Sequence, residues 1–424
     1  MSCEACALKL ALREGERGRK TGDSRYVSPS PCLPLTLSSC VRRTSSVVPI
    51  EGCTRPSENR LISLAGIMLV VSIAAKPVLT EVRDPEAWNA LVSSLPFSSA
   101  LQGWGWGEVK RHSGWTPFRL KLEVDGVLIA AAQVLRRKQG PLGILYCPRG
   151  PALRSLEDVD AVAAALRSWA GPGDVSLKIE PPVPILSDGT GAGIPSSLGV
   201  WQNVESTQPE HTVLLDLTKP EADFMKAMHE MARRNTKTSL KMGVTAEVEQ
   251  DFAAFWELFS ETNGRSSLMQ HSRSYYEAVW TECNKHGGEA AIITARFEGK
   301  ALASGLMIGL GDGLNYLYGG STRLERAEGE KDPKGSNGFY WGMIRHGMAR
   351  GYKSLDLFGI PRILSEDKHS FGVYQFKERL GGQKVHFPAY EIALSPVSSL
   401  VNGVLRLRKN VMNYRARGTT KDVL

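Results

Sequence analysis

The sequence lacks the motifs that mark several large enzyme classes. It has no glycine-rich phosphate loop of the P-loop type, no HExxH zinc motif and no GxSxG nucleophile elbow. The segment GWGWG at residues 103–107 has the wrong spacing for a dinucleotide-binding or kinase glycine loop. We predict a tight turn beside an aromatic core there.

Cysteine is scarce in the body of the chain. Beyond residue 53 only Cys147 and Cys283 occur, which is too few for a disulfide scaffold and predicts a reducing, cytoplasmic compartment. Cys3 and Cys6 form one CxxC pair, but no second pair follows at zinc-finger spacing, so we expect no metal site. The remaining cysteines are Cys32, Cys40 and Cys53.

A hydrophobic run of membrane-spanning length is also missing. The longest run, residues 61–75, has fifteen residues, which is too short to cross a bilayer comfortably. One interpretation is the core of a signal peptide. The interpretation we favour takes Met68 as the natural start, with residues 69–73 opening the first strand. Residues 1–67 are then a disordered or upstream-translated tail, because they are rich in Ser, Pro, Arg and Cys and lack periodicity.

Positive charge is concentrated at the two ends of the chain. The formal net charge is +8, but residues 1–67 contribute +4 and residues 396–424 contribute +5, which leaves −1 for everything between. A generally basic, DNA-coating surface is therefore not expected, although a local basic patch could bind an anionic ligand. With 424 residues, 42% of them hydrophobic, the chain is long enough for two globular domains.

Alternating helix and strand patterns predict an α/β (α+β) fold in two similar halves. In the first half we expect a helix at 84–95, a turn towards a strand at 102–110, a hairpin of 118–124 and 127–136, a helix at 155–170, a strand at 175–180 and a loop at 186–199. In the second half we expect strands at 212–216, 246–248, 313–319 and 354–358, a hairpin of 289–297 and 300–310, and helices at 220–242, 251–263, 275–285 and 338–350. A similar hairpin segment occurs in each half, VDGVLIAAAQVL in the first and FEGKALASGLMI in the second. This similarity suggests tandem copies of one fold.

Eight segments between residues 95 and 395 carry a resemblance to a known family. In order they are LQGWGWGEVKRHSGWTPFRLKLEVDG, YCPRGPAL, LKIEP, MARRNTKTSLKMGV, YYEAVW, NYLYGGS, LDLFGI and YQFKERLGG. Together they resemble the FemABX family of peptidyltransferases, which transfer an amino acid from aminoacyl-tRNA to the stem peptide of a peptidoglycan precursor. The resemblance implies tandem GNAT-like (acetyltransferase-like) domains. The helical arm of longer family members is missing, so the chain is similar to the short forms that add the first bridge residue.

The reaction that the resemblance implies requires few catalytic groups. An aminoacyl-tRNA ester is already activated, so an amine can attack it without ATP, metal or a protein nucleophile, and we expect no cofactor. Alignment of the reactants and stabilisation of the tetrahedral oxyanion remain for the enzyme. The expected partners are aminoacyl-tRNA and a UDP-linked muropeptide or lipid-linked precursor, and the expected state is a monomer.

Two residues are catalytic candidates. Lys377 matches the family's FK motif, to which the resemblance assigns stabilisation of the developing negative charge; the alternative is a solvated lysine on a helix. Glu180 ends an apolar strand before a proline, where a carboxylate could orient or deprotonate the attacking ammonium. Family members often have Asp at this position, so a structural cap is the alternative.

Several further residues are candidates for substrate binding. Lys110, together with Arg265 or Arg273, matches positions that hold the diphosphate of a nucleotide-sugar peptide in short family forms, and exposed charge is the alternative. Tyr276 lies in the matching Tyr-Tyr helix. Strand alternation predicts that Tyr316 and Tyr318 share one face, as cleft lining or as core.

Two basic helix faces are candidates for contact with tRNA phosphates or anionic lipid, including the inner face of the membrane. Solvated helix faces are the alternative. The residues are Arg233, Arg234 and Lys237 on the first, and Arg406, Arg408 and Lys409 on the second.

We expect domains at residues 76–210 and 211–388, with a C-terminal basic helix in 389–424 folding onto the first domain. Two rival functions remain open. A coenzyme A dependent N-acyltransferase would share the fold, but its Gln/Arg-x-x-Gly-x-Gly/Ala pyrophosphate turn is missing. A non-catalytic binder of tRNA or membrane would need only the basic tail.

Overall fold

The computed structural model describes residues 62–64, 67–69, 77–186, 202–266, 271–322, 324, 329–361 and 371–417. The chain divides into two compact units, Met1–Ser72 and Ile73–Leu424. In the first unit, β1 (Ile62–Leu64) and β2 (Ile67–Leu69) pair antiparallel, with Ser63 opposite Met68. Most of the predicted tail, most of the predicted opening strand and nearly all of the predicted loop at 186–199 lie outside the described residues.

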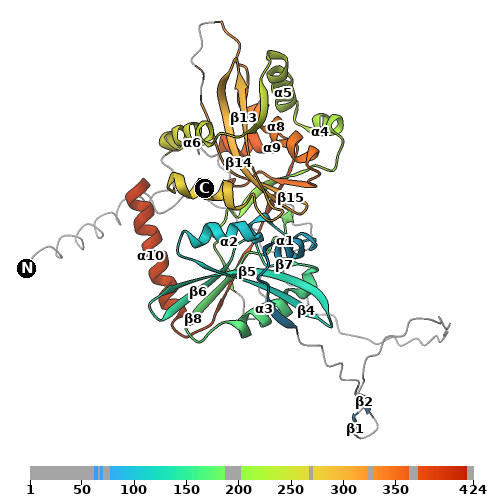
Figure 1. Cartoon of the computed structure of the whole chain (residues 1–424), viewed down its shortest axis with the longest axis vertical. Helices are drawn as coiled ribbons and strands as arrows, with labels where there is room; N and C mark the ends of the chain where they lie inside the picture. The colour runs from blue at the N-terminus through green and yellow to red at the C-terminus, as the bar shows by residue number, and fades with distance from the viewer. Residues whose placement is uncertain are drawn as a thin grey trace, which may run out of the picture. The chain divides into compact units, whose positions relative to one another are not determined.

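In the larger unit the first sheet is built from the N-terminal half with one strand from the C-terminal end (Figure 1). Its order is β10 (Gln202–Val204), β18 (Ala389–Ala393), β8 (Asp174–Ile179), β6 (Leu142–Cys147), β5 (Val127–Gln139), β4 (Thr116–Val124) and β3 (Val78–Glu81), and β7 (Ala152–Leu153) pairs with β5. Its helices are α1 (Pro85–Ser93), α2 (Trp104–Arg111) and α3 (Val159–Trp169). Asp84 caps α1 by accepting from the Ala87 amide at 2.7 Å.

The second sheet repeats the same core. Its order is β12 (Thr245–Glu249), β13 (Glu289–Phe297), β14 (Lys300–Leu310), β15 (Gly313–Ser321), β16 (Ser354–Asp356), β11 (His211–Asp216), β17 (Gln383–His386) and β9 (Ile185–Leu186). Its helices are α4 (Glu221–Ala227), α5 (Glu230–Met242), α6 (Phe252–Ser266), α7 (Arg273–Glu282), α8 (Gly335–Ala349) and α9 (Phe371–Glu378).

Each half contains the predicted hairpin, β4–β5 or β13–β14, together with a parallel crossover, as the internal similarity predicts. The hairpin turns Asp125-Gly126 and Glu298-Gly299 have positive φ at both positions, which suits the right-handed twist of the paired strands. β6 and β8 run parallel across α3, and β15 and β16 run parallel across α8. The prediction of an α/β (α+β) fold is confirmed.

The predicted domain limits stay a prediction, because strands are exchanged across them. β9 precedes residue 210 yet pairs with β17 of the second sheet, and β18 follows residue 388 yet pairs with β8 of the first. The C-terminal helix α10 (Ser398–Arg417) is tied to the first sheet, since Asn402 donates to Glu391 of β18 at 2.5 Å. Among the helices that the structure describes, none has both the length and the apolar content needed to cross a membrane.

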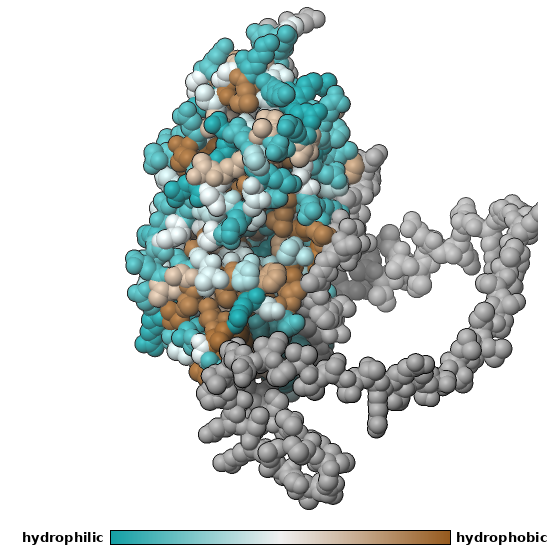
Figure 2. Space-filling model, turned by 90° about the vertical axis from the view of Figure 1, so that its right-hand side faces the viewer, coloured by the Kyte–Doolittle hydropathy of each residue, from teal (hydrophilic) through white to brown (hydrophobic). Residues whose placement is uncertain are grey.

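One hydrophobic cluster joins the two halves. Trp88 of α1 and Trp106 of α2 pack with Phe255 of α6 and Tyr276 of α7 in this cluster. A buried amide adds a polar link, because Asn89 donates to the His286 carbonyl at 2.7 Å and accepts from the Trp104 amide at 2.8 Å. These contacts fix α2 against α7. On the face that Figure 2 shows, apolar residues form separate patches among polar ones.

Two local predictions are wrong. Residues 103–107 form no tight turn: Gly103 caps α2, and the following residues are its first turns, in place of the expected approach to a strand. Gly105 is required by packing, because a Cβ there would lie 2.2 Å from the Glu282 carbonyl oxygen. The single helix predicted at 220–242 is broken into α4 and α5, where His229 accepts from the Met231 amide as a new N-cap.

Candidate active site

Lys110 lies in the contact between α2 and α7. Its ammonium donates to the Tyr275 hydroxyl at 2.7 Å and lies 4.4 Å from the centroid of the Trp106 ring. Burial lowers the pKa of Lys110 to about 8. Among the described residues no carboxylate forms an ion pair with this ammonium. A cation that lies between aromatic rings without an ion-pair partner among the described residues is suited to an anionic ligand.

Tyr276 and Tyr318 lie beside Tyr275, the hydrogen-bond partner of Lys110. Their rings meet edge to face with centroids 4.9 Å apart, and the Tyr318 hydroxyl interacts with that of Tyr275. Burial raises the pKa of Tyr275 to about 12, so its hydroxyl stays protonated at neutral pH. Tyr275 was missed as a site residue in the sequence, although the Tyr-Tyr motif contains it.

Tyr316 does not share a face with Tyr318, so that prediction is wrong. The register of β14 and β15 shifts between Leu306 and Met307, because Leu306 pairs with Tyr318 whereas Met307 pairs with Tyr316. The extra residue in β15 is a β-bulge, which reverses the alternation. Tyr318 therefore packs towards α6 and α7, whereas Tyr316 packs against Phe339 and Tyr340 of α8.

Lys377 of α9 is buried, which excludes the alternative of a solvated lysine. Its ammonium donates to the carbonyl oxygens of Leu357 at 2.8 Å and Gly359 at 2.9 Å, and also to that of Phe358. Burial lowers the pKa of Lys377 to about 8, although the charge of Asp356 acts in the opposite direction. Three carbonyls thus hold the ammonium just beyond the end of β16.

Glu180 follows β8 and is held by several donors. One carboxylate oxygen accepts from the Tyr146 hydroxyl at 2.6 Å, and the other accepts from the Thr207 amide at 2.5 Å and the Gln208 amide at 3.3 Å. The side chain is 1% exposed. A carboxylate so occupied resembles a structural anchor more than a base with a free lone pair.

Arg149 connects the ends of β8 and β16, and it was missed in the sequence although the RGP segment contains it. Its guanidinium donates to the Pro209 carbonyl at 2.6 Å and lies 4.0 Å from the Phe387 ring centroid. Burial lowers its pKa, and the charges of Asp356 and Glu180 oppose that shift. Asp356 accepts from the Thr212 hydroxyl at 2.5 Å. Two buried cations thus lie among two buried carboxylates, which balances the charge.

The other predicted residues lie outside these two clusters. Arg273 is half exposed and pairs with Glu277 at 2.8 Å. Arg233 donates to the Lys226 carbonyl at 2.9 Å, which caps α4. The exposed members of the basic faces are Arg234, Lys237 and Arg408. The side chains of Arg265, Arg406 and Lys409 lie outside the described residues.

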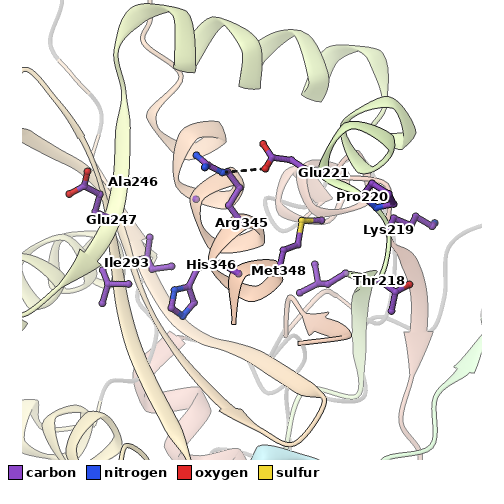
Figure 3. Close-up of a pocket in the computed structure, with 14 residues that line it drawn as sticks. Thr218, Lys219, Pro220, Glu221, Ala246, Glu247, Ile293, Arg345, His346 and Met348 are labelled. Atoms are coloured by element: carbon purple, nitrogen blue, oxygen red, sulfur yellow. Dashed lines mark ion pairs between the residues drawn. The ribbon is translucent and has the colours of Figure 1, made fainter. Parts of the chain in front are cut away.

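A separate pocket of about 760 Å³ lies between the end of β11, the strand β12 and the C-terminal half of α8 (Figure 3). Arg345 and Glu221 pair at its rim with 3.5 Å between nitrogen and oxygen. Neither cluster described above contributes to its lining. No group of three or more potential metal ligands occurs among the residues that the structure describes.

Comparison with known proteins places these features in context. The model of the FemAB family matches residues 198–298 and 288–389, which include Tyr276, Tyr318 and Lys377 but not Lys110 or Glu180. The Lipid II:glycine glycyltransferase of Staphylococcus aureus (strain MRSA252) is 24% identical over 227 residues, which are 50% of this chain and 53% of that protein. The protein of the same name from Staphylococcus aureus (strain COL) matches equally.

The chain therefore spans about half the length of the curated relatives it matches. Among solved structures, FemX superposes with a TM-score of 0.65 at 18% identity, over 76% of this chain and 99% of FemX. This likeness shows a shared fold over the larger unit. It agrees with the two similar α+β halves seen in the repeated sheets.

Proposed function

As this chain belongs to the FemABX family, we propose that it is an acyltransferase that moves an amino acid from aminoacyl-tRNA to the stem-peptide amine of a peptidoglycan precursor. Relatives named Lipid II:glycine glycyltransferase support this class of reaction. We further propose that it acts in the cytoplasm, where charged tRNA and the precursor are available.

The observation that carries the proposal is the partly buried Lys110. An ammonium packed between Trp106 and Tyr275, with no carboxylate partner among the described residues, is a costly arrangement that an anionic ligand would stabilise. A diphosphate linking a nucleotide or lipid to the muropeptide is such a ligand. Hydroxyls of Tyr275 and Tyr318 would supply further hydrogen bonds.

The chemical step is aminolysis of an ester. The amine nitrogen attacks the ester carbonyl carbon, a C–N bond forms, and the C–O bond to the tRNA ribose breaks. The nitrogen loses a proton and the departing ribose oxygen gains one, so no other reactant is consumed. Lys377 places a positive charge where backbone carbonyls converge, and we assign it to the oxyanion. Glu180 would position the segment around Arg149, with no proton transfer required of it.

Contact with tRNA is assigned to the exposed charges of α5. Arg234 and Lys237 are exposed, and the residues four positions after them, Thr238 and Lys241, are not acidic. Their charges are therefore available to phosphates. Arg233 is less suited, because its guanidinium caps α4. Neutralising Arg234 and Lys237 together should weaken tRNA binding and reduce its salt dependence.

The test is a transfer assay with the full-length chain. The reaction would contain charged tRNA and a UDP-linked muropeptide, or its lipid-linked form, and mass spectrometry would follow the acceptor. A mass gain of one aminoacyl residue, absent with uncharged tRNA, is the expected result. Acyl transfer from acetyl coenzyme A without transfer from tRNA would support the rival acyltransferase instead. Binding of tRNA with no product in any arm would support the non-catalytic rival.

A further inference from the structure

The C-terminal helix α10 carries an apolar stripe that faces away from the protein. Its members, at alternating spacings of four and three residues, form one narrow face of the helix. We call them the outward stripe: Leu400, Val404, Leu407, Val411 and Tyr414, which are 70%, 59%, 65%, 42% and 61% exposed. Exposed apolar side chains in one row are unusual on a monomer surface and mark an interaction site.

The opposite side of α10 is already occupied. Ser398 is buried, and Asn402 donates to Glu391 of β18 at 2.5 Å. Figure 1 shows α10 beside the β6 and β8 side of the first sheet. The outward stripe is therefore an apolar face on the side of α10 that is turned away from these contacts.

The charge around the stripe has one sign. Residues 392–421 contain six basic residues and no acidic one. Arg408 and Arg415 are both exposed, and by helical spacing they lie on the same flank of the stripe. An apolar stripe with a basic flank, on a helix too polar to span a bilayer, is the pattern of a helix that lies in a membrane interface.

Other occupants fit these observations less well. A second copy of the chain could pair through the stripe, but two such helices would bring basic flanks together without any acidic partner. Transfer RNA would engage the arginines and leave the apolar residues exposed. Anionic lipid satisfies both features, because its acyl chains cover the stripe while its headgroups contact the basic flank.

We propose that α10 docks this protein on the surface of an anionic bilayer, with the outward stripe inserted below the headgroups. The inference rests on α10 alone and does not require the proposed transferase reaction. If that reaction uses a lipid-linked acceptor, α10 would bring the enzyme to it.

The experiment is flotation of the full-length chain with vesicles of phosphatidylglycerol and phosphatidylcholine, beside vesicles of phosphatidylcholine alone. The double variant Leu400→Ser/Leu407→Ser should reduce partitioning into the anionic vesicles by about a hundredfold, at about tenfold for each buried leucine. The matched control is Val248→Ser, which removes a side chain that is 45% exposed on β12; it should bind like the wild type. Arg408→Gln/Arg415→Gln should reduce binding about thirtyfold, and added salt should mimic it.

Circular dichroism should show that all variants fold, since every substituted side chain is exposed. Failure of the wild type to float with anionic vesicles would overturn the proposal, as would equal flotation of the leucine variant. Lipid-independent dimerisation that the leucine variant abolishes, measured by sedimentation velocity, would assign the stripe to a second copy instead. Transfer to a soluble UDP-linked muropeptide tests the proposed transferase reaction without a membrane. The docking proposal and the transferase proposal can therefore fail independently.

Discussion

Replacing Lys377 by methionine tests the catalytic centre and the fold together. The change keeps the aliphatic stem and removes an ammonium that donates to three consecutive carbonyls after β16. From the family motif alone, stability would barely change. The structure predicts otherwise, because three buried acceptors lose their donor.

The expected magnitude follows from two opposing effects. Loss of the donor to three buried carbonyls costs roughly 5 kcal/mol. Removing the buried charge regains roughly 3 kcal/mol of this loss, because burying the ammonium is unfavourable: it lowers the pKa of Lys377 from 10.5 to about 8. The net loss is about 2 kcal/mol, which lowers Tm by several degrees. Turnover of the folded molecule should fall by about 10² to 10³, the range expected when a group that stabilises the oxyanion electrostatically is lost.

Thr212→Val is the matched control, because it disturbs the same strand end without touching Lys377. It deletes the hydroxyl that donates to Asp356 at 2.5 Å and should cost about 1 to 2 kcal/mol. Its turnover, corrected for the folded fraction, should stay within about threefold of wild type. Chemical denaturation measures the stabilities, and single-turnover transfer under folded conditions measures the rates.

Lys377→Arg should rescue little, because a planar fork cannot replace a point charge that is held by three converging carbonyls. Retention of more than about a tenth of wild-type turnover by Lys377→Met would refute the assignment to the oxyanion. If both variants lose stability and neither loses rate, Lys377 is a structural anchor.

Three further predictions concern the Lys110 cluster and the buried charges. Lys110→Met should leave stability unchanged or higher, because it removes a partly buried cation that has no carboxylate partner among the described residues, while precursor affinity measured by calorimetry falls about tenfold or more; a marked loss of stability would contradict this account. Gly105→Ala should cost about 2 to 3 kcal/mol and weaken precursor binding, since its Cβ would lie 2.2 Å from the Glu282 carbonyl oxygen, whereas Gly264→Ala, with open space around it in α6, should stabilise by about 0.5 to 1 kcal/mol. The free energy of unfolding should rise between pH 8 and 10, because Lys110 and Lys377 have folded pKa values of about 8 against 10.5 when unfolded, so the unfolded chain binds more protons in that window. This stabilisation is complete above pH 10.5 and lost as the pH falls through 8, and its slope should be smaller in Lys110→Met; a flat profile would refute it.

Elements with a strong local pattern could be predicted from the sequence, and features set by distant partners could not. Both hairpins follow from alternating apolar residues around Asp125-Gly126 and Glu298-Gly299, since the turn itself requires positive φ. The bulge in β15 leaves no such local signal, because it depends on how β15 pairs with β14. The sequence also suggests a turn at Gly105, because the residue that requires a glycine there is distant in the sequence. The backbone of Glu282 approaches Gly105 so closely that a Cβ would not fit.

Burial lowers the pKa of both lysines at the centre of the proposal to about 8, but the groups around each ammonium differ, and this separates their roles. The Lys377 ammonium donates hydrogen bonds to three backbone carbonyls, which makes its position rigid. The nearby charge of Asp356 compensates its positive charge. Lys110 has one hydroxyl and two aromatic faces around it, none of which carries a negative charge at neutral pH. An ammonium held by rings can turn its remaining hydrogens to an incoming anion without breaking an ion pair. Lys110 is therefore the better ligand-binding group, and Lys377 the better source of a fixed positive potential.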